Sequence, residues 1–281
     1  MNTRLIVSTV LAPAGALLLL AAGAARQQAP ALPASGDSAV AALNASPRHG
    51  EWVKYDGGSG DSVRAWVVHP ERRDRAPVVV VIHENSGLSD WARAVADRLA
   101  ADGFIAIAPD LLSGKGPNGG GTESVDRQGA LALNRALDRG EVQRRLAAAA
   151  RYGTSLPSAT NRFGVVGFCW GGGQSFNFAV TSPELGASVV YYGPSPADSL
   201  LESVRAPVLG LYGGDDARIN AMVPPAQAKM QQLGKRYEVH TYEGAGHGFL
   251  RDQAGREGAN RRAAEQAWPR TIAFFREHLG R

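Results

Sequence analysis

The sequence predicts one α/β domain, built on a mostly parallel sheet with helices on both faces. Runs of β-branched residues alternate with amphipathic stretches along most of the chain, which is typical of a parallel sheet. The run from Ala76 to His83 is almost continuously apolar, as a strand buried on both faces requires. With 281 residues, 44% of them hydrophobic and 20% charged, the chain can bury a sizeable core, and wholesale disorder is excluded.

The expected elements follow one another in a regular order. Two strands at 51–55 and 62–69 are joined by a glycine-rich hairpin, and the buried strand at 76–83 comes next. Ser89 is a plausible N-cap for a helix that runs to about Ala101, and Gly103 ends it. The remaining expected strands are 104–108, 163–168, 187–192, 207–212 and 237–242; the remaining helices are 141–152, 170–181, 224–233 and 261–279, with a long glycine-rich loop before 141.

The first residues, 1–24, have the pattern of a secretory signal peptide. A positively charged start leads into an apolar run over 5–22, and small residues then precede a cleavage site near Ala24. The alternative is an uncleaved membrane anchor, but the run contains Pro13 and Gly15 and is short for a span of roughly 20 residues. We therefore expect a periplasmic or secreted protein with no stable membrane association after cleavage.

Composition divides the rest of the chain into two parts. Residues 25–46 are rich in Ala, Pro, Gln and Ser and are expected to form a flexible linker. Residues 47–281 contain no internal repeat and no second core, so they form the single domain.

The net charge of +4 comes from arginines scattered among acids, as in 71–75, which favours a solvated surface over a nucleic-acid site. It weakly favours an acidic small substrate.

The single cysteine, Cys169, lies in the segment Gly-Phe-Cys-Trp-Gly-Gly-Gly over 167–173, between a predicted strand and a predicted helix. This is the G-x-S-x-G nucleophile elbow with Cys in place of Ser, a tight turn that exposes the nucleophile. The helix N-terminus directed at the sulfur would favour the thiolate. The alternative is a buried cysteine that acts as a small hydrophobic residue.

Two later segments each carry a polar residue just after a predicted strand. Asp216 follows the strand at 207–212, and His247 follows the strand at 237–242. Nucleophile, acid and base therefore occur in the order Cys, Asp, His, and all three are expected at the carboxyl edge of the sheet. Seen singly, the aspartate could be a turn residue and the histidine a surface residue.

Several motifs together resemble the dienelactone hydrolase family, which has the α/β-hydrolase fold. They are the elbow itself, the Gly-x-x-Asp of 213–216, the Gly-His-Gly-Phe of 246–249 and the His-Glu-Asn of 83–85. The resemblance extends from about Glu51 to Leu279. It implies a catalytic triad of Cys169, Asp216 and His247, and its Gly-x-x-Asp spacing selects Asp216 over the neighbouring Asp215.

The resemblance also implies roles outside the triad. Glu84 would lie beside the cysteine and help to generate or hold the thiolate, although a loop acid that caps a turn is the alternative. The backbone N–H groups of Asn85 and Trp170 would form the oxyanion hole. Arg251 would bind a carboxylate of the substrate.

The resemblance also implies that a second arginine of the family corresponds to Arg127, counted back along the sequence from the helix expected at 141–152. The tyrosine that the family holds one helical turn later is Leu131 in this chain. A solvated surface charge therefore stays open as the alternative for Arg127.

The function that follows is hydrolysis of a small ester or lactone through a thioester, as in a carboxymethylenebutenolidase. No metal and no cofactor are expected, because none of the six histidines is paired at ligand spacing. The alternative from another class is a non-catalytic periplasmic binding protein on the same fold. A thiol-redox protein is disfavoured because the cysteine has no resolving partner.

Overall fold

The computed structural model describes residues 32–280, and its framework is one eight-stranded sheet. The strands are β1 (Gly50–Gly58), β2 (Asp61–Val68), β3 (Ala76–Ile82), β4 (Ile105–Pro109), β5 (Ala159–Phe168), β6 (Ala187–Tyr191), β7 (Val208–Gly213) and β8 (Tyr237–Tyr242). Their order is β1-β2-β4-β3-β5-β6-β7-β8. Only the β1–β2 and β2–β4 pairings are antiparallel, so the expected mostly parallel sheet is confirmed.

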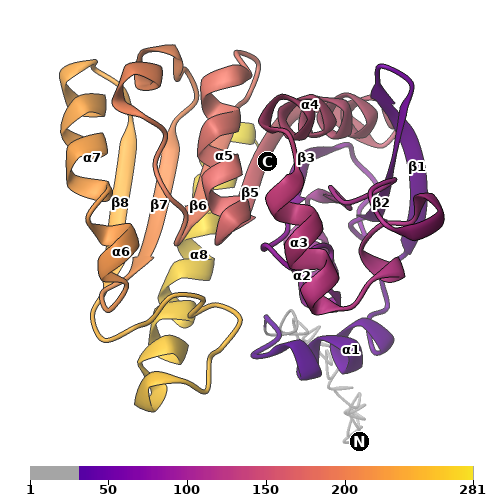
Figure 1. The fold of residues 1–281 in the computed structure, drawn as a ribbon, viewed down its shortest axis with the longest axis horizontal. Coiled ribbons are helices and arrows are strands. Elements are labelled where there is room, and N and C mark those ends of the chain that lie inside the picture. Colours follow the sequence, from indigo (N-terminus) through magenta and orange to yellow (C-terminus); the bar gives the residue numbers. More distant parts are fainter. Residues whose placement is uncertain (1–31, 281) are drawn as a thin grey trace, which may run out of the picture.

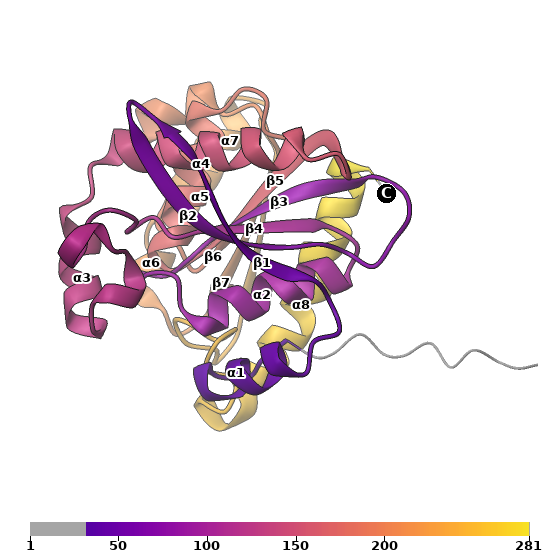
Figure 2. The ribbon, with the colours of Figure 1, turned by 90° about the vertical axis from the view of Figure 1, so that its right-hand side faces the viewer.

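Helices cover both faces of this sheet. They are α1 (Gly36–Asn44), α2 (Asp90–Ala101), α3 (Arg127–Ala136), α4 (Arg139–Ser155), α5 (Trp170–Thr181), α6 (Ala217–Asn220), α7 (Val223–Gln232) and α8 (Ala259–Leu279). One face carries α4, α5 and α7, and the other carries α1, α2 and α8 (Figures 1 and 2). Apolar side chains on each layer bury the corresponding side of the central strands, which explains why those strands are apolar on both faces.

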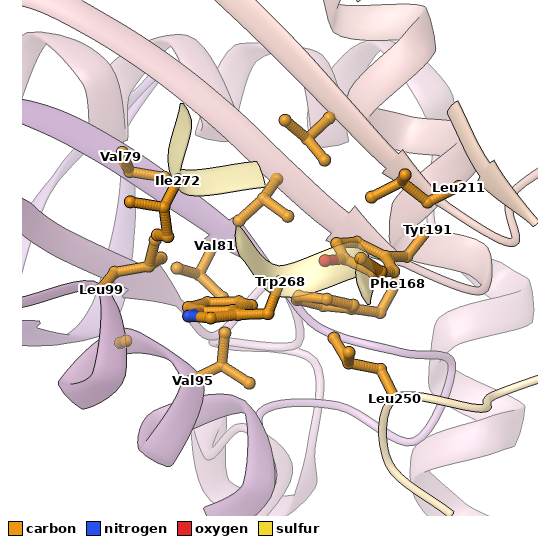
Figure 3. Close-up of a cluster of buried hydrophobic side chains, with 14 of the residues drawn as sticks. Val79, Val81, Val95, Leu99, Phe168, Tyr191, Leu211, Leu250, Trp268 and Ile272 are labelled. Carbon is orange, nitrogen blue, oxygen red and sulfur yellow. The ribbon is translucent and has the colours of Figure 1, made fainter. Parts of the chain in front are cut away.

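The core beneath α2 and α8 fixes the central strands (Figure 3). Val81 of β3 packs with Val95 of α2 and Trp268 of α8, while Phe168 at the end of β5 lies against Tyr191 of β6 with ring centroids 5.1 Å apart. Each such side chain contributes roughly 1.5–3 kcal/mol by leaving water. The carboxyl ends of β3, β5 and β6 are therefore held by a dense apolar layer directly behind them.

The strand order creates a crevice at the carboxyl end of β3 and β5. The chain passes from β3 outward to β4 on one side, then returns to β5 and continues outward to β8 on the other side. Ligands in open α/β sheets bind at such a reversal of strand order. The segment after β3 contains Glu84 and the turn after β5 contains Cys169, so both flank this crevice.

The structure differs from the expectations in the linker and in the helices α3 and α6, and one prediction lies outside the described residues. The expected flexible linker is corrected for residues 32–46, because this part is ordered and contains α1, whose Ala39 is fully buried. The stretch expected as loop before residue 141 ends in an additional helix, α3, capped by Asp126. The predicted signal peptide lies outside the described residues, and within 32–280 no helix is both long and apolar enough to cross a bilayer.

Candidate active site

Cys169 occupies a strained turn between β5 and α5. Its φ is 55° and its ψ is −116°, a conformation that costs a residue with a side chain about 1–3 kcal/mol. Small neighbours make the turn possible, because a Cβ on Gly167 would lie 1.9 Å from the carbonyl oxygen of Gly171. The turn is held by a bond from the Cys169 N–H to the Tyr191 carbonyl at 3.1 Å. Strand and helix thus approach closely enough to present the thiol at the crevice.

His247 and Asp216 form a close pair at the same edge of the sheet. The Nδ1 atom of His247 lies 2.5 Å from Oδ2 of Asp216, which is 7% exposed and caps α6. The neighbouring Asp215 is exposed and pairs instead with Arg256 at 3.0 Å. The structure therefore brings the predicted acid, and not its neighbour, to the histidine. A buried carboxylate in this position fixes the imidazole tautomer and supports a positive charge on the ring.

Tyr192 lies near both the cysteine and the histidine. Its ring centroid is 5.1 Å from that of His247, and its hydroxyl is close enough to Cys169 for the two groups to interact electrostatically. Burial raises the pKa of this tyrosine well above its usual value. The hydroxyl has no hydrogen-bond partner within residues 32–280. In the sequence Tyr192 is only the last residue of the strand expected at 187–192, and its φ of 40° just past β6 becomes visible only in the structure.

The Cys169 thiol is protonated at neutral pH. Burial, followed by the negative charge of Glu84, raises the pKa of this thiol to about 11. The backbone N–H of Trp170 and the cations Arg218 and Arg251 act in the opposite direction without outweighing burial. The helix N-terminus was expected to favour the thiolate. The N–H of Trp170 does lower the pKa of Cys169, but burial raises it more, so the thiol is neutral in the free protein.

Glu84 is held by Arg251 from the loop after β8. Nε of Arg251 donates to Oε2 of Glu84 at 2.6 Å, and the carboxylate side chain is only 12% exposed. The charge of Glu84 raises the pKa of the guanidinium. The negative charge of Glu84 raises the pKa of Cys169, and the positive charge of Arg251 lowers it. Because Arg251 pairs with Glu84, it partly offsets the effect of this carboxylate on the thiol.

Comparison with known proteins places this geometry in a family. A model described as the dienelactone hydrolase family matches residues 63–279. The chain belongs to the dienelactone hydrolase family.

Relatives and a solved structure agree with this assignment. A protein of Salmonella typhimurium named "Putative carboxymethylenebutenolidase" is 31% identical over 235 residues, covering 79% of this chain and 85% of the relative. A protein of the same name from Saccharolobus solfataricus is 31% identical and is covered over 97% of its length. The crystal structure of a "Putative Dienelactone Hydrolase" from Klebsiella pneumoniae superposes with a TM-score of 0.71 at 26% identity, covering 81% of this chain and 98% of that one. This member of the dienelactone hydrolase family is therefore a hydrolase with the α/β-hydrolase fold, of a family that acts on small esters or lactones.

A pocket of about 320 Å³ in this dienelactone hydrolase-family chain collects several predicted residues. Glu84, Asn85, Arg127 and Arg251 all line it, although more than 160 positions separate the first from the last. Arg127 is the first residue of α3 and is exposed, and no acid is paired with it in the described part of the chain. The structure therefore brings the two arginines suggested by the family resemblance to one pocket.

The two residues predicted to form the oxyanion hole follow two neighbouring strands. Asn85 is exposed and lies three residues after β3, and Trp170 is the first residue of α5, which follows β5. The indole of Trp170 stacks on His83 with centroids 5.5 Å apart, and His83 is fully buried and accepts from the backbone N–H of Leu111. This stack fixes the start of α5 relative to the end of β3.

The structure also shows parts of the pocket that sequence reasoning missed. Gly36 of α1 and Trp91 of α2 line it, and Arg218 of α6 is near enough to lower the pKa of Cys169. No motif marks the first two residues, since a glycine in an alanine-rich stretch and a tryptophan in an amphipathic helix are unremarkable. Arg218 lies two residues after Asp216, so its position past a strand end was the available signal. No cluster of potential metal ligands occurs among residues 32–280.

Proposed function

We propose that the chain is an exported, cysteine-dependent hydrolase of small esters or lactones that carry a carboxylate, acting through a thioester. One observation carries the proposal. Cys169 in a strained strand-to-helix turn shares one sheet edge with His247, with the buried Asp216 that pairs with it, and with Glu84. This combination supplies a nucleophile, a base that a carboxylate orients, and a second carboxylate beside the thiol.

Substrate binding would convert the thiol to a nucleophile. In the free protein Arg251 pairs with Glu84, and the thiol stays protonated. A substrate carboxylate that takes over Arg251 would leave Glu84 without its cation, which favours uptake of the thiol proton by Glu84. The thiolate is then formed only when substrate is present. This would protect an exported protein from oxidation of its single cysteine.

The remaining steps follow from the geometry. The thiolate of Cys169 attacks the carbonyl carbon, and the backbone N–H groups of Asn85 and Trp170 stabilise the oxyanion. Collapse forms the thioester and releases the alkoxide or enolate, which takes the proton that Glu84 received from the thiol. His247, oriented by Asp216, then removes a proton from water, and the resulting attack releases the carboxylic acid and the thiolate. The proton on His247 returns to the sulfur and restores the neutral thiol of the free protein.

The direct test is detection of the thioester. Purified protein mixed with a p-nitrophenyl ester that carries a carboxylate, such as p-nitrophenyl hemisuccinate, and quenched in acid should show, by intact-mass spectrometry, one added acyl group that hydroxylamine removes. Peptide mapping should place it on Cys169. Turnover with acylation at any other residue, or with none, would contradict the proposal, and binding of the ester without turnover would favour the non-catalytic binding protein.

Glu84→Gln is expected to shift the pKa of Cys169 below about 11, since the charge of Glu84 raises that pKa. At a fixed pH between 7 and 10 the free variant should then contain more thiolate and react faster with iodoacetamide, while turnover of a substrate with a carboxylate should fall about 10²-fold or more. The measurement is the alkylation rate against pH. Glu243→Gln, at an exposed acid after β8, is the control; a shift upward or no shift in Glu84→Gln would contradict the prediction.

Arg251→Gln is expected to raise KM for an anionic dienelactone by about tenfold or more, because a charged hydrogen bond to the substrate carboxylate is lost. KM for a neutral aryl acetate should stay within about twofold, since no carboxylate has to be bound. Steady-state rates on the two substrates give both values. Arg256→Gln is the control, because Arg256 pairs with the exposed Asp215 outside the pocket. Equal effects on both substrates would argue against a carboxylate site.

Export gives a separate expectation. Protein recovered from the periplasm should have an amino terminus near Ala25, as the charge and small-residue pattern of 1–24 predicts. Amino-terminal sequencing checks this. An intact Met1 on protein confined to the cytosolic fraction would be incompatible with the predicted signal peptide.

A further inference from the structure

Residues 33–44 connect two elements that border the pocket. The carbonyl of Pro33 accepts a hydrogen bond from Nε1 of Trp91 at 3.2 Å, and also from Nε2 of Gln253 at 3.5 Å. The carbonyl of Ala34 accepts from the backbone N–H of Gln253 at 3.1 Å. Trp91 belongs to α2, and Gln253 lies two residues after Arg251. The segment therefore connects the loop that carries Arg251 to α2.

The helix that follows is docked on the domain. A capping box at its start has the Ser38 N–H donating to Ser35 Oγ at 3.2 Å and the Ser35 N–H donating to Ser38 Oγ at 3.0 Å. Ala39 is fully buried in the core shared with α2, whereas the next residue, Val40, is 46% exposed. Figure 1 shows α1 directly below α2, at the bottom of the view. The helix thus has one buried face and one solvent face.

The first residue of this helix is part of the pocket wall. Gly36 lines the same pocket as Glu84, Arg127 and Arg251. Gly36 is exposed, and a Cβ on it would meet no atom within 4 Å, so there is room for a larger side chain at this position. Its backbone φ lies outside the left-handed region, so a larger residue can replace it without backbone strain.

We propose that residues 33–44 determine substrate specificity by limiting the length of the carboxylate-bearing arm of the ester or lactone. Arg251 and Arg127 would hold the carboxylate, and Gly36 at the start of α1 would form the wall beyond them, so the accepted acids are short-chain dicarboxylic half-esters or the equivalent lactones. The segment precedes residue 63, where the match to the family model begins. This inference rests on the proposed function, because it assigns the acid arm to the pocket that Glu84 and Arg251 line.

The test uses p-nitrophenyl half-esters of succinate, glutarate, adipate and suberate with the full chain. Wild-type kcat/KM is expected to fall by about tenfold or more from the shortest to the longest acid. Ala39→Glu places a charge under α1 and should undock it, which would reduce that preference to less than about threefold by raising kcat/KM for the long acids. Val40→Glu puts the same charge on the solvent face of the same helix and should keep the wild-type preference.

A second variant tests the wall without undocking it. Gly36→Phe fills the open space and should raise KM about tenfold for the long acids, with little change in kcat or in the succinate KM. Thermal unfolding of each variant establishes that the domain is folded. An unchanged chain-length preference in both Ala39→Glu and Gly36→Phe, or none in the wild type, would overturn the role of α1. Hydrolysis of every half-ester that persists in Cys169→Ala would instead overturn the proposed function.

Discussion

Replacing Cys169 with alanine is expected to lower kcat/KM for esters and lactones by at least about 10⁴-fold, because the variant cannot form the thioester. The loss should appear in kcat, since the pocket lined by Glu84 and Arg251 remains for binding. Alanine meets the same backbone strain as cysteine at a φ of 55°, so the turn is expected to persist. Steady-state rates, with the thermal unfolding midpoint as a fold check, give the result.

Cys169→Ser is the matched variant for this prediction. It keeps a nucleophilic atom in the turn, but a hydroxyl loses its proton far less readily than a thiol, so turnover should fall strongly while remaining above that of Cys169→Ala. Wild-type turnover in the alanine variant would mean that another group attacks the carbonyl. The two variants therefore separate a chemical role of the sulfur from a structural role of the elbow.

The central strands and the elbow could be predicted from the sequence because local sterics and burial determine both. The run of β3 is apolar at every position, which fits only a strand covered on both faces. The glycines around Cys169 are required because the backbone of the turn approaches them too closely for a side chain. A Cβ on Gly167, for example, would lie 1.9 Å from the carbonyl oxygen of Gly171. Chain order and strand ends then placed Asp216 and His247 at the correct edge.

Besides the short α6, the helices α1 and α3 could not be predicted because little of their own sequence is buried. In α1 only Ala39 is fully buried, and the helix is positioned by main-chain carbonyls that bond to Trp91 and Gln253, far away in sequence. In α3 only Ala130 and Asn134 are buried. Composition predicted a flexible linker for the first stretch and a glycine-rich loop for the second, whereas tertiary contacts order both helices.

The charge arrangement of the pocket was also beyond sequence patterns alone. Glu84 and Arg251 are separated by 167 positions, and no spacing rule connects residues so far apart. Family resemblance suggested each of them separately, together with Arg127. Their meeting in one pocket depends on the adjacency of β3 and β5 and on the return of the loop after β8 to the same edge.

Asp216→Asn is expected to lower kcat by at least about 10²-fold. The carboxylate lies 2.5 Å from Nδ1 of His247 and is buried, so its charge supports an imidazolium in low dielectric surroundings. An amide keeps the shape but removes the charge and can donate to Nδ1, which would impose the wrong tautomer. The deficit should be largest in hydrolysis of the thioester, where His247 must accept a proton from water.

Asp215→Asn is the control that the chain itself offers. The two aspartates are adjacent in sequence, but Asp215 is exposed and pairs with Arg256, so its loss should change kcat by less than about twofold. Pre-steady-state mixing with a p-nitrophenyl ester distinguishes the steps, since Asp216→Asn should retain a burst of p-nitrophenol followed by slow turnover. If both variants lost activity equally, the effect would lie in the conformation of the loop after β7. If neither did, His247 would act without an orienting acid, and the buried carboxylate would serve only to cap α6.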